Sequence, residues 1–308
     1  MQDYELTLYD RIEVIKATNQ KYDLENNAYL SFSGGKDSTV LHYLLDLALP
    51  NNTIPRVFID TGIEYTMIRN FVLKLAENDE RIKIIKPSQA IKPMLEKNGY
   101  PFKSKEHSLR VYQFNKGMNS NYIKKYISGY DHKGKKSTFV CPKILLYQFE
   151  EKGKYNYSNL CCYKLKKEPV KKWQKENNRS IVLTGMRADE GGNRRRLGCV
   201  ITDKKSGKIV KFHPLIKIDD DFENWFVNKI EKEREIRILC ELYYEPFNFK
   251  RTGCRGCPYS LDLEEQLEIM ERYLPNERKA CEIIWKPVYD EYRRLNYRLK
   301  QVEQIKLL

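Results

Sequence analysis

The stretch YLSFSGGKDSTVLHYLLDL, residues 29–47, joins two kinds of secondary structure through one short polar loop. A run of apolar residues stops at Ser33, two glycines follow, and an apolar pattern with helical spacing resumes at Val40. A glycine-rich loop between a strand and a helix presents unpaired backbone N–H groups and the positive end of the helix dipole, and both attract anions. The sequence therefore predicts a phosphate-binding loop at residues 33–38.

The residue types in this loop suit a phosphate ligand. The glycines let the backbone approach the ligand closely, the serine hydroxyls can donate hydrogen bonds, and the lysine adds a positive charge. The loop is not a Walker A loop, because Leu30 replaces the first glycine of that motif and Asp37 follows the lysine. The residues that we expect to contact phosphate are Ser33, Gly34, Gly35, Lys36 and Ser38.

The Ser-Gly-Gly-Lys-Asp-Ser run resembles the pyrophosphate-binding loop of the ATP-pyrophosphatase superfamily, whose members cleave ATP between the α and β phosphates or bind an already adenylated substrate. The resemblance implies an α/β fold of the adenine nucleotide alpha-hydrolase-like type. It also implies that the ligand is ATP with Mg²⁺, or a nucleotide of the adenylyl sulfate type, and that Lys36 and Asp37 take part in catalysis. A plain tight turn is the alternative interpretation.

The end of the next expected strand, FIDTGIEY at residues 58–65, resembles the phosphoadenosine phosphosulfate reductase branch of the same superfamily. In that branch Asp-Thr-Gly closes the second strand beside the nucleotide. The resemblance therefore implies a catalytic role for Asp60 and nucleotide contacts from Thr61 and Gly62.

The stretch TGMRADEGGNRR, residues 184–195, resembles a later loop of that branch, in which arginines meet the anionic part of the ligand. The resemblance implies that Arg187 and Arg194 bind the nucleotide, and Arg195 and Arg196 are further candidates. An arginine side chain can bind phosphate or sulfate through two parallel hydrogen bonds. For residues 194–196 the alternative is a solvated basic run on the surface.

Apolar periodicity along the chain predicts the order strand–helix–strand–helix–strand, which is typical of a parallel sheet with right-handed crossovers. We therefore expect an α/β fold in which helices cover both faces of a parallel sheet, with a basic helical insert and a helical C-terminal portion. The predicted domains are a nucleotide-binding domain at 1–218, with the insert at about 88–160, and a helical portion at 219–308 that carries a Cys-x-x-Cys. The strands are expected near 27–33, 54–62, 82–87, 180–186 and 208–216, and the first helices near 5–25, 36–49 and 66–78.

Basic residues concentrate in the middle of the chain. The formal net charge is +14, and residues 81–175 contain 23 Lys and Arg against 6 Asp and Glu. Tyrosines alternate with lysines in NYIKKYISGYDHKGKK, residues 121–136, a composition compatible with stacking on bases. The insert therefore predicts an anionic partner, either the nucleotide or a nucleic acid, with a solvated lysine-rich face as the alternative.

The chain has eight cysteines, and four of them form two pairs with the spacing of ligands. Cys161 and Cys162 are adjacent, and Cys254 and Cys257 form the Cys-x-x-Cys. Two such pairs can close one four-thiolate site that holds a 4Fe–4S cluster or a structural zinc ion. The run Cys-Cys-x-x-x-Lys-x-x-Pro at residues 161–169 resembles the cluster-bearing adenylyl-sulfate reductases, which implies the cluster. A redox disulfide or buried core thiols are the remaining alternatives.

These features lead to three candidate functions. The first is an ATP-pyrophosphatase-type sulfurtransferase that thiolates a nucleic acid, as in DNA phosphorothioation or RNA thiolation, with a sulfur-donor protein as partner. The second is an oxidoreductase, a phosphoadenylyl- or adenylyl-sulfate reductase. Reductases of adenylyl sulfate carry a catalytic cysteine in a C-terminal Glu-Cys-Gly-x-His run, whereas the last cysteine here is Cys281. The third is a non-catalytic nucleotide-binding module of a larger assembly.

The sequence predicts a cytoplasmic protein without membrane contact. No stretch approaches the roughly 20 apolar residues that a membrane-spanning helix needs. The N-terminal residues are acidic and then amphipathic, unlike a secretory signal peptide. In a cytoplasmic chain this number of cysteines favours metal or thiol chemistry over disulfides.

Overall fold

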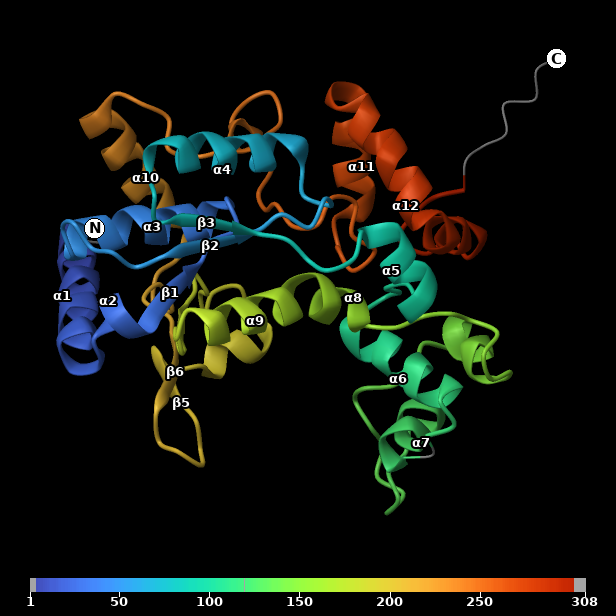
Figure 1. The fold of residues 1–308 in the computed structure, drawn as a ribbon. Helices are drawn as coiled ribbons and strands as arrows, with labels where there is room; N and C mark the ends of the chain where they lie inside the picture. The colour runs from blue at the N-terminus through green and yellow to red at the C-terminus, as the bar shows by residue number, and fades with distance from the viewer. Residues whose placement is uncertain (1–3, 119, 302–308) are drawn as a thin grey trace. The chain divides into compact units, whose positions relative to one another are not determined.

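The computed structural model describes residues 4–118 and 120–301 (Figure 1). The residues cluster into two compact units, and each is described here by itself. Unit 1 takes in the described residues up to Asp60 together with Glu64–Lys86 and Glu168–Gly253. Unit 2 takes in Thr61–Ile63, Pro87–Lys167 and the described residues from Cys254 onward.

Unit 1 is built on a six-stranded sheet with the strand order β3-β2-β1-β4-β6-β5. Neighbouring strands run parallel, except that β5 pairs antiparallel with β6. The prediction of a parallel sheet in an α/β fold is therefore confirmed, although the sequence pattern does not predict the short and partly exposed β5. The strands are β1 (Ala28–Ser31), β2 (Arg56–Ile59), β3 (Ile82–Ile85), β4 (Ile181–Leu183), β5 (Val200–Thr202) and β6 (Ile209–Phe212).

Helices cover both faces of this sheet (Figure 1). On one face, α3 (Lys36–Ala48) follows β1 and α4 (Thr66–Asn78) follows β2, as right-handed crossovers require. On the other face, α9 (Glu168–Glu176) packs against β2 and β3. The remaining helical elements of unit 1 are α1 (Tyr4–Tyr22), α2 (Leu24–Asn27), α10 (Asp220–Arg234) and two 3-10 turns at Gly192–Arg196 and Glu241–Tyr243.

The apolar residues around the first strand explain why the sheet forms at this place. The first three residues of β1 are buried, and Val40, Leu41, Leu44 and Leu45 of α3 are fully buried. A strand that is covered on both faces needs such a continuous apolar run. Because β2, β1 and β4 are neighbours and parallel, their carboxyl ends lie at one edge of the sheet. The loops that follow these three strands therefore begin at that edge.

Unit 2 is mostly helical, and its aromatic residues form its core. Phe102 stacks on Tyr157 with ring centroids 4.5 Å apart, and it contacts Tyr292 at 4.8 Å. The buried His107 bonds Tyr126 and Gln148 through its two ring nitrogens, so it is satisfied within the core. The helical elements are α5 (Ile91–Asn98), α6 (Lys105–Asn115), α7 (Asn121–Ser128), α8 (Leu160–Cys162), α11 (Leu263–Tyr273), α12 (Pro275–Arg294), a 3-10 turn at Lys143–Phe149 and a π-helical turn at Tyr163–Lys167.

The two units divide the chain differently from the predicted domains. The sequence places a boundary after residue 218, whereas α10 and the chain up to Gly253 cluster with the sheet in unit 1. The basic insert clusters with the residues from Cys254 onward, because its aromatic core includes Tyr292 of α12. Among the helices of residues 4–118 and 120–301, none is both long and apolar enough to span a membrane.

Candidate functional site

The predicted phosphate loop lies between β1 and α3 at the carboxyl edge of the sheet. Gly34 has a φ of +70°, and a Cβ added there would lie only 2.7 Å from Cγ2 of Val72 and 3.1 Å from Cγ2 of Ile68 on α4. Both the backbone conformation and this close approach require glycine. Gly35 is the N-cap residue of α3, so the loop leads directly into the positive end of the helix dipole.

Three backbone N–H groups of the loop already have hydrogen-bond partners. Ser33 N–H donates to Oγ of Ser38 at 3.2 Å, Gly35 N–H donates to Oγ of Ser33 at 3.2 Å, and Lys36 N–H donates to Oη of Tyr243 at 3.0 Å. The prediction that the loop amides are unpaired is therefore wrong for these three groups. Because all three acceptors are hydroxyl oxygens, a phosphate group that binds the amides has to replace hydroxyls and not bulk water alone.

Tyr243 is a part of the loop environment that the sequence motifs do not reveal. Its Oη also bonds Oγ1 of Thr252 at 2.5 Å. A Cβ on Gly35 would lie 3.1 Å from Oη of Tyr243 and 3.2 Å from Oγ1 of Thr252, so this glycine makes room for the hydroxyl pair. Tyr243 lies about two hundred residues beyond the loop in the chain, and no spacing rule connects the two.

The predicted catalytic and anion-binding side chains of unit 1 meet in an ion-pair network. Arg187 follows β4, and its side chain is only 5% exposed. Its Nε lies 3.1 Å from Oδ1 of Asp37, and its Nη2 lies 2.7 Å from Oδ1 of Asp220. Nζ of Lys36 lies 3.4 Å from Oδ1 of Asp220 and 3.4 Å from Oε2 of Glu223. The structure thus brings Lys36, Asp37 and Arg187 together and adds two carboxylates from α10.

Glu223 is the most deeply buried member of the network. Its side chain is 0% exposed, and neither of its carboxylate oxygens accepts a hydrogen bond from a described residue. Burial, and then the neighbouring charge of Asp37, raise the pKa of Glu223 to about 8, against the opposing effect of Arg187 and Lys36. A protonated Glu223 can donate to Asp37, so the two carboxyls can share one proton. No sequence pattern marks this residue.

A close contact between two loops fixes the position of Asp37. A Cβ added to Gly185, in the loop after β4, would lie 2.6 Å from the carbonyl oxygen and 2.9 Å from the Cβ of Asp37. Only glycine therefore lets the loop that carries Arg187 come this close to the first turn of α3. The closeness explains why Arg187 and Asp37 can form their ion pair.

Asp60, the predicted catalytic carboxylate after β2, is 8% exposed. Its Oδ2 accepts a hydrogen bond from Nε of Arg69 on α4 at 3.0 Å. Its backbone N–H donates to the carbonyl oxygen of Ile85 at 2.9 Å. Its carboxylate is therefore held by α4. Asp60 lies at the same edge of the sheet as the phosphate loop because β1 and β2 are parallel neighbours.

Arg194 is placed differently from Arg187. Its side chain is 41% exposed and pairs with Glu190 at 3.1 Å, and Arg251 also pairs with that glutamate. Arg195 and Arg196 are exposed. Glu190 thus neutralises part of this basic run, and Arg187 is the only one of these four arginines of the loop after β4 with a buried side chain in the described structure.

Thr61 and Gly62 cluster with unit 2, although they follow Asp60 directly. Oγ1 of Thr61 accepts a hydrogen bond from Ile63 N–H at 3.4 Å. Gly62 has a φ of +78°, and a Cβ there would meet no atom within 4 Å, so glycine serves the backbone conformation alone. Ile63 accepts a hydrogen bond from Arg255 N–H at 2.7 Å, which ties this segment to the Cys-x-x-Cys loop.

The four predicted ligand cysteines all belong to unit 2. Cys161 and Cys162 lie on α8 with their Sγ atoms 3.9 Å apart. The hydrogen bond to Cys162, burial and the nearby thiols of Cys162, Cys257 and Cys254 raise the pKa of Cys161. The hydrogen bond from Cys161 and the charges of neighbouring lysines lower the pKa of Cys162. The two cysteine pairs are thus close enough to influence each other electrostatically.

The donor set suits thiolate-bound iron or zinc. All eight cysteines carry thiols and none forms a disulfide. Within the described ranges, no three His, Cys, Asp or Glu side chains already surround one point at the distances of a single metal ion. Zinc needs all its thiolates at about 2.3 Å from one ion, whereas the thiolates of a cluster bind different iron atoms. The four thiols suit a zinc ion or an iron–sulfur cluster by chemical type, and all four belong to unit 2.

Helix α12 holds the Cys-x-x-Cys loop by its backbone. Nε1 of Trp285 donates to the carbonyl of Arg255 at 3.0 Å, and Oη of Tyr289 donates to the carbonyl of Gly256 at 2.5 Å. Oη of Tyr292 donates to the carbonyl of Pro258 at 2.9 Å. These three buried donors fix the loop through its backbone carbonyls.

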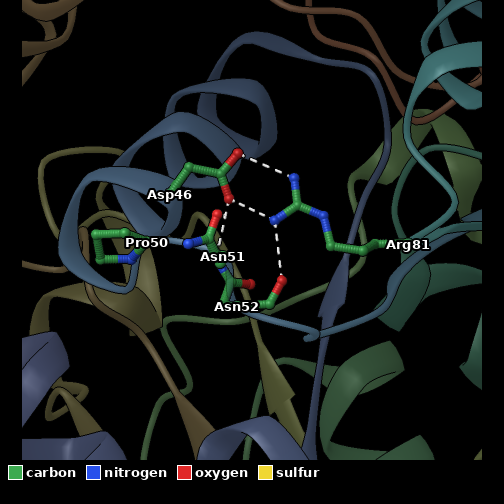
Figure 2. Close-up of a pocket in the computed structure, with 5 residues that line it drawn as sticks. All are labelled: Asp46, Pro50, Asn51, Asn52 and Arg81. Carbon is green, nitrogen blue, oxygen red and sulfur yellow. Dashed lines mark hydrogen bonds and ion pairs between the residues drawn. The ribbon is translucent and has the colours of Figure 1, made fainter.

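A cavity of about 530 Å³ opens at the other end of α3. It is lined by Asp46, Pro50, Asn51, Asn52 and Arg81 (Figure 2). Nη1 of Arg81 lies 2.7 Å from Oδ1 of Asp46, and it donates to the carbonyl of Asn52 at 3.2 Å. None of the predicted site residues lines this cavity, and its polar groups bind one another, so we assign it a structural role.

Comparison with known proteins agrees with the motifs. The chain matches the model of the phosphoadenosine phosphosulfate reductase domain over residues 27–136 and 136–260, which include the phosphate loop and both cysteine pairs. An uncharacterized protein of Methanocaldococcus jannaschii is 25% identical over 305 residues, which are 94% of this chain and 58% of the relative. The chain therefore spans less than two thirds of the length of that curated relative.

Solved structures also resemble this chain at low identity. The phosphoadenylyl-sulfate reductase of Candida auris, in a phosphate complex, is 17% identical with a TM-score of 0.46, and the match covers 79% of this chain and 87% of that one. The U34-tRNA thiolase NcsA of Methanococcus maripaludis, with its 4Fe–4S cluster, is 18% identical with a TM-score of 0.37 and coverages of 96% and 82%. The family model, in contrast, spans the sheet, the phosphate loop and the cysteine pairs, and the chain therefore belongs to the phosphoadenosine phosphosulfate reductase domain family.

Proposed function

We propose that the protein is an ATP-dependent sulfurtransferase that activates an oxygen of a nucleic acid and replaces it with sulfur. The observation that carries the proposal is the loop at residues 33–38, where the start of α3 and the side chain of Lys36 lie beside the ion-pair network of Arg187. Membership of a family of adenine nucleotide enzymes supports ATP, bound as its Mg²⁺ chelate, as the ligand of this loop.

In the first step the acceptor oxygen attacks the α phosphorus of ATP. The bond from this phosphorus to the bridging oxygen breaks, and pyrophosphate leaves with the electron pair. The helix dipole, the loop amides and Lys36 stabilise the charge that develops on the leaving group. Lys36 can turn to the phosphates because its present partners hold it only loosely: Asp220 and Glu223 at 3.4 Å and Asn224 at 3.3 Å.

In the second step a donor protein supplies sulfur at the oxidation level of sulfide. The sulfur attacks the atom that bears the activated oxygen, the bond to that oxygen breaks, and AMP leaves with it. No electron is gained or lost, so the step needs no reductant. A 4Fe–4S cluster, when bound, supplies iron that binds sulfur and exchanges electrons. Cys161, Cys162, Cys254 and Cys257 would hold it, and zinc is the alternative for the same thiols.

A sulfate-reducing oxidoreductase is the second candidate, and the family match favours it. Such a reaction needs a thiol that attacks the sulfur of the nucleotide. Cys199 is only half-buried, but burial raises its pKa, and its Sγ donates to the carbonyl of His213 at 3.4 Å. A thiol in that state is a poor nucleophile, so Cys199 gives no support to the second candidate.

Release of pyrophosphate from ATP tests the proposal. We expect the wild type to release it when a nucleic acid acceptor is present, and Lys36→Met to lower kcat/KM by at least about 10-fold, the effect of one missing charge-assisted hydrogen bond. Lys204→Met, an exposed lysine of the β5–β6 turn, is the matched control and should behave as the wild type. Reduction of adenylyl sulfate without any pyrophosphate release would establish the oxidoreductase instead. Nucleotide binding without either reaction would establish a non-catalytic module.

The metal content tests the role of the cysteines separately. We expect protein purified without oxygen to be brown, with iron, acid-labile sulfide and visible thiolate-to-iron absorption, and Cys257→Ala to lose all three. Cys199→Ala, outside the four-cysteine set, should keep them. One zinc ion per chain without sulfide would make the four thiols a structural zinc site. Protein with neither metal would overturn a shared site.

A further inference from the structure

Unit 2 carries an exposed surface in which aromatic rings alternate with lysines, and neither step of the proposed reaction uses it. We call it the aromatic–lysine surface and define it by Tyr122, Tyr130, Phe139, Lys124 and the lysines of residues 133–136. The three aromatic residues are 70%, 55% and 46% exposed, and the lysines are exposed as well. These residues follow or lie on α7 (Figure 1).

The fold builds a hairpin that presents the lysines. Helix α7 ends at Gly129, which adopts the left-handed conformation with a φ of 82°. The chain then returns, so that Tyr130 pairs with Lys136 in an antiparallel bridge and Ser137 N–H donates to the carbonyl of Gly129 at 2.8 Å. At the tip, Oδ1 of Asp131 accepts backbone hydrogen bonds from residues 133 and 135 at 2.9 Å each. The lysines therefore project from an internally bonded turn.

The aromatic rings are exposed although they are held in place. Phe139 stacks on the buried Tyr126, with ring centroids 5.0 Å apart and an angle of 30° between the planes. The guanidinium of Arg110 lies 5.4 Å from the ring centroid of Tyr122. Exposed apolar rings lack the stabilisation that burial gives, and three of them fall between residues 122 and 139 of one basic segment. Phe139 and Tyr122, which have these contacts, lose little entropy when a flat ligand stacks on them.

The charge of this region is strongly one-sided. Residues 116–149 contain seven lysines and a single carboxylate, Asp131. That carboxylate is occupied by the backbone of the hairpin and by the charge of nearby Lys125. The rest of the positive charge has no acidic residue within the segment to balance it, and it therefore favours a polyanion as the partner.

We propose that the aromatic–lysine surface binds a single-stranded segment of nucleic acid, with bases stacked on Tyr122, Tyr130 and Phe139 and phosphates bound by the lysines. Bases of a single strand expose their faces to such rings, whereas bases of a duplex are covered by their neighbours. An acidic protein or an anionic membrane would also satisfy the lysines, whereas a single strand uses both the lysines and the flat faces of the rings. The inference rests on the proposed function for its purpose, since it identifies how the acceptor is held.

Binding of a fluorescein-labelled oligonucleotide, measured by fluorescence anisotropy without ATP, tests the surface directly. We expect the double variant Tyr122→Ala, Tyr130→Ala to bind a single strand at least about 25-fold more weakly, at about five-fold for each base that no longer stacks. The slope of log K against log salt should stay unchanged in this variant. The triple variant Lys133→Gln, Lys135→Gln, Lys136→Gln should instead reduce that slope by about 0.7 for each phosphate that the lysines no longer bind.

Control variants in unit 1 match each change. Tyr9→Ala removes an aromatic side chain that is 64% exposed, and Lys204→Gln with Lys205→Gln and Lys208→Gln removes three exposed lysines between β5 and β6. Both should bind as the wild type does. The same oligonucleotide as a duplex should bind the wild type more weakly than the single strand, and removal of the two tyrosines should not change duplex binding.

The possible results separate this inference from the proposed function. Equal weakening of duplex and single-strand binding in the lysine variant, with no effect of the tyrosines, would overturn base stacking. Binding only to vesicles that contain phosphatidylserine, or only to an acidic protein, would overturn a nucleic acid partner. A wild type that releases pyrophosphate with the nucleic acid acceptor, but whose strand binding is unchanged in the tyrosine and lysine variants, overturns this inference alone. A wild type that binds the strand through these rings but leaves ATP intact overturns the sulfurtransferase alone.

Discussion

Glu223 lies between two cations and a carboxylate that come from two other elements. Lys36 and Asp37 face it from α3, and Arg187 faces it from the loop after β4. The two cations favour its charged form, but complete burial and Asp37 favour its neutral form, and the latter effects prevail. The protonation of the Glu223 carboxylate on α10 therefore affects Lys36 and Asp37, which lie in the phosphate loop and the first turn of α3.

The raised pKa of Glu223 predicts a dependence of stability on pH. Because the folded-state pKa of about 8 lies above the unfolded value of 4.5, the folded state binds more protons between these values, and stability falls as the pH rises through this window. We expect Glu223→Gln to remove this contribution, so that the free energies of unfolding of wild type and variant diverge by up to about 1.4 kcal/mol per pH unit. Urea unfolding at pH 5, 6, 7 and 8 measures it.

A matched carboxylate on the same helix controls for charge alone. Glu233 is exposed on α10 and pairs with Lys229 at 3.0 Å, so Glu233→Gln shows what the loss of an exposed carboxylate on this helix does. Parallel stability curves for wild type and Glu223→Gln would show that Glu223 is ionised in the folded state across the window, which would contradict the shared proton with Asp37.

At this scale the sequence predicts part of the site. The run Ser-Gly-Gly-Lys-Asp-Ser identifies the loop, because its glycines and its place between strand and helix are local properties. Tyr243 and Glu223 could not be predicted, since each reaches the loop from about two hundred residues away through the packing of other elements. The same distance explains why the sequence does not predict the hydroxyl partner of the Lys36 amide.

At the scale of elements, side chains of α12 hold the backbone of the Cys-x-x-Cys loop in place. Gly256 has a φ of +59°, and a Cβ there would lie 2.5 Å from Oη of Tyr289 and 2.7 Å from Sγ of Cys281. The glycine therefore lets the loop pass close enough to α12 for its carbonyl to accept the hydrogen bond of Tyr289. Cys281 of α12, which is fully buried, provides part of this packing.

Gly256→Ala should consequently destabilise the protein more than a glycine substitution that only strains the backbone. Gly134 is the matched control in unit 2, because its φ is +75° and a Cβ there would meet no atom within 4 Å. Both variants should lose about 1–2 kcal/mol of folding stability, because alanine disfavours the left-handed backbone conformation. Only Gly256→Ala also places a Cβ against the packed core. We expect a further decrease of at least about 1 kcal/mol in the free energy of unfolding by urea.

A second variant tests the same contact between α12 and the Cys-x-x-Cys loop if Gly256→Ala does not fold. Tyr289→Phe keeps the ring and removes the hydrogen bond to the loop, and it should cost about 1 kcal/mol. Equal destabilisation by Gly256→Ala and Gly134→Ala, together with no effect of Tyr289→Phe, would show that α12 does not hold the loop.

Elements with a strong local pattern could be predicted, and those that depend on distant partners could not. The helices at residues 36–48 and 66–78 coincide with apolar patterns of helical spacing, and both lie within a residue of their expected bounds. Strand β5 has only three residues with no buried position, so its sequence carries little signal, and it forms because β6 offers an edge. The hydrogen bonds from α12 to the Cys-x-x-Cys loop correspond to no recognisable sequence pattern in either segment.

At the scale of the whole molecule, the chain passes between the two units several times. Unit 1 and unit 2 each combine segments from separate parts of the sequence, so a single boundary after residue 218 cannot describe them. The basic insert and the four cysteines belong to one unit and the phosphate loop to the other, whereas the sequence places the insert and the phosphate loop in one domain. The division predicts that two different ligands stabilise two different sets of backbone amides.

Hydrogen exchange can test this division in the full chain. At 100 times its dissociation constant, ATP with Mg²⁺ should stabilise the state that binds it by about 2.7 kcal/mol, which slows exchange of the slowest amides about 100-fold. We expect this protection in β1 and α3 of unit 1 but not in α7 of unit 2. Removal of the cysteine-bound metal by a chelator should act on unit 2 instead. We expect it to speed amide exchange around α8 and the Cys-x-x-Cys loop and to leave β1 and α3 unchanged.

Lys36→Met serves as the control for the nucleotide arm, because it should lose the protection of unit 1 and leave the effect of chelation unchanged. Cys257→Ala should show the fast exchange of unit 2 before any chelator is added. Equal protection of both units by ATP would mean that they unfold as one cooperative block, and nucleotide binding would then stabilise the cysteine site as well. Separate responses would instead mean that the phosphate loop and the cysteine pairs can each be loaded without the other, as a two-step transfer of sulfur requires.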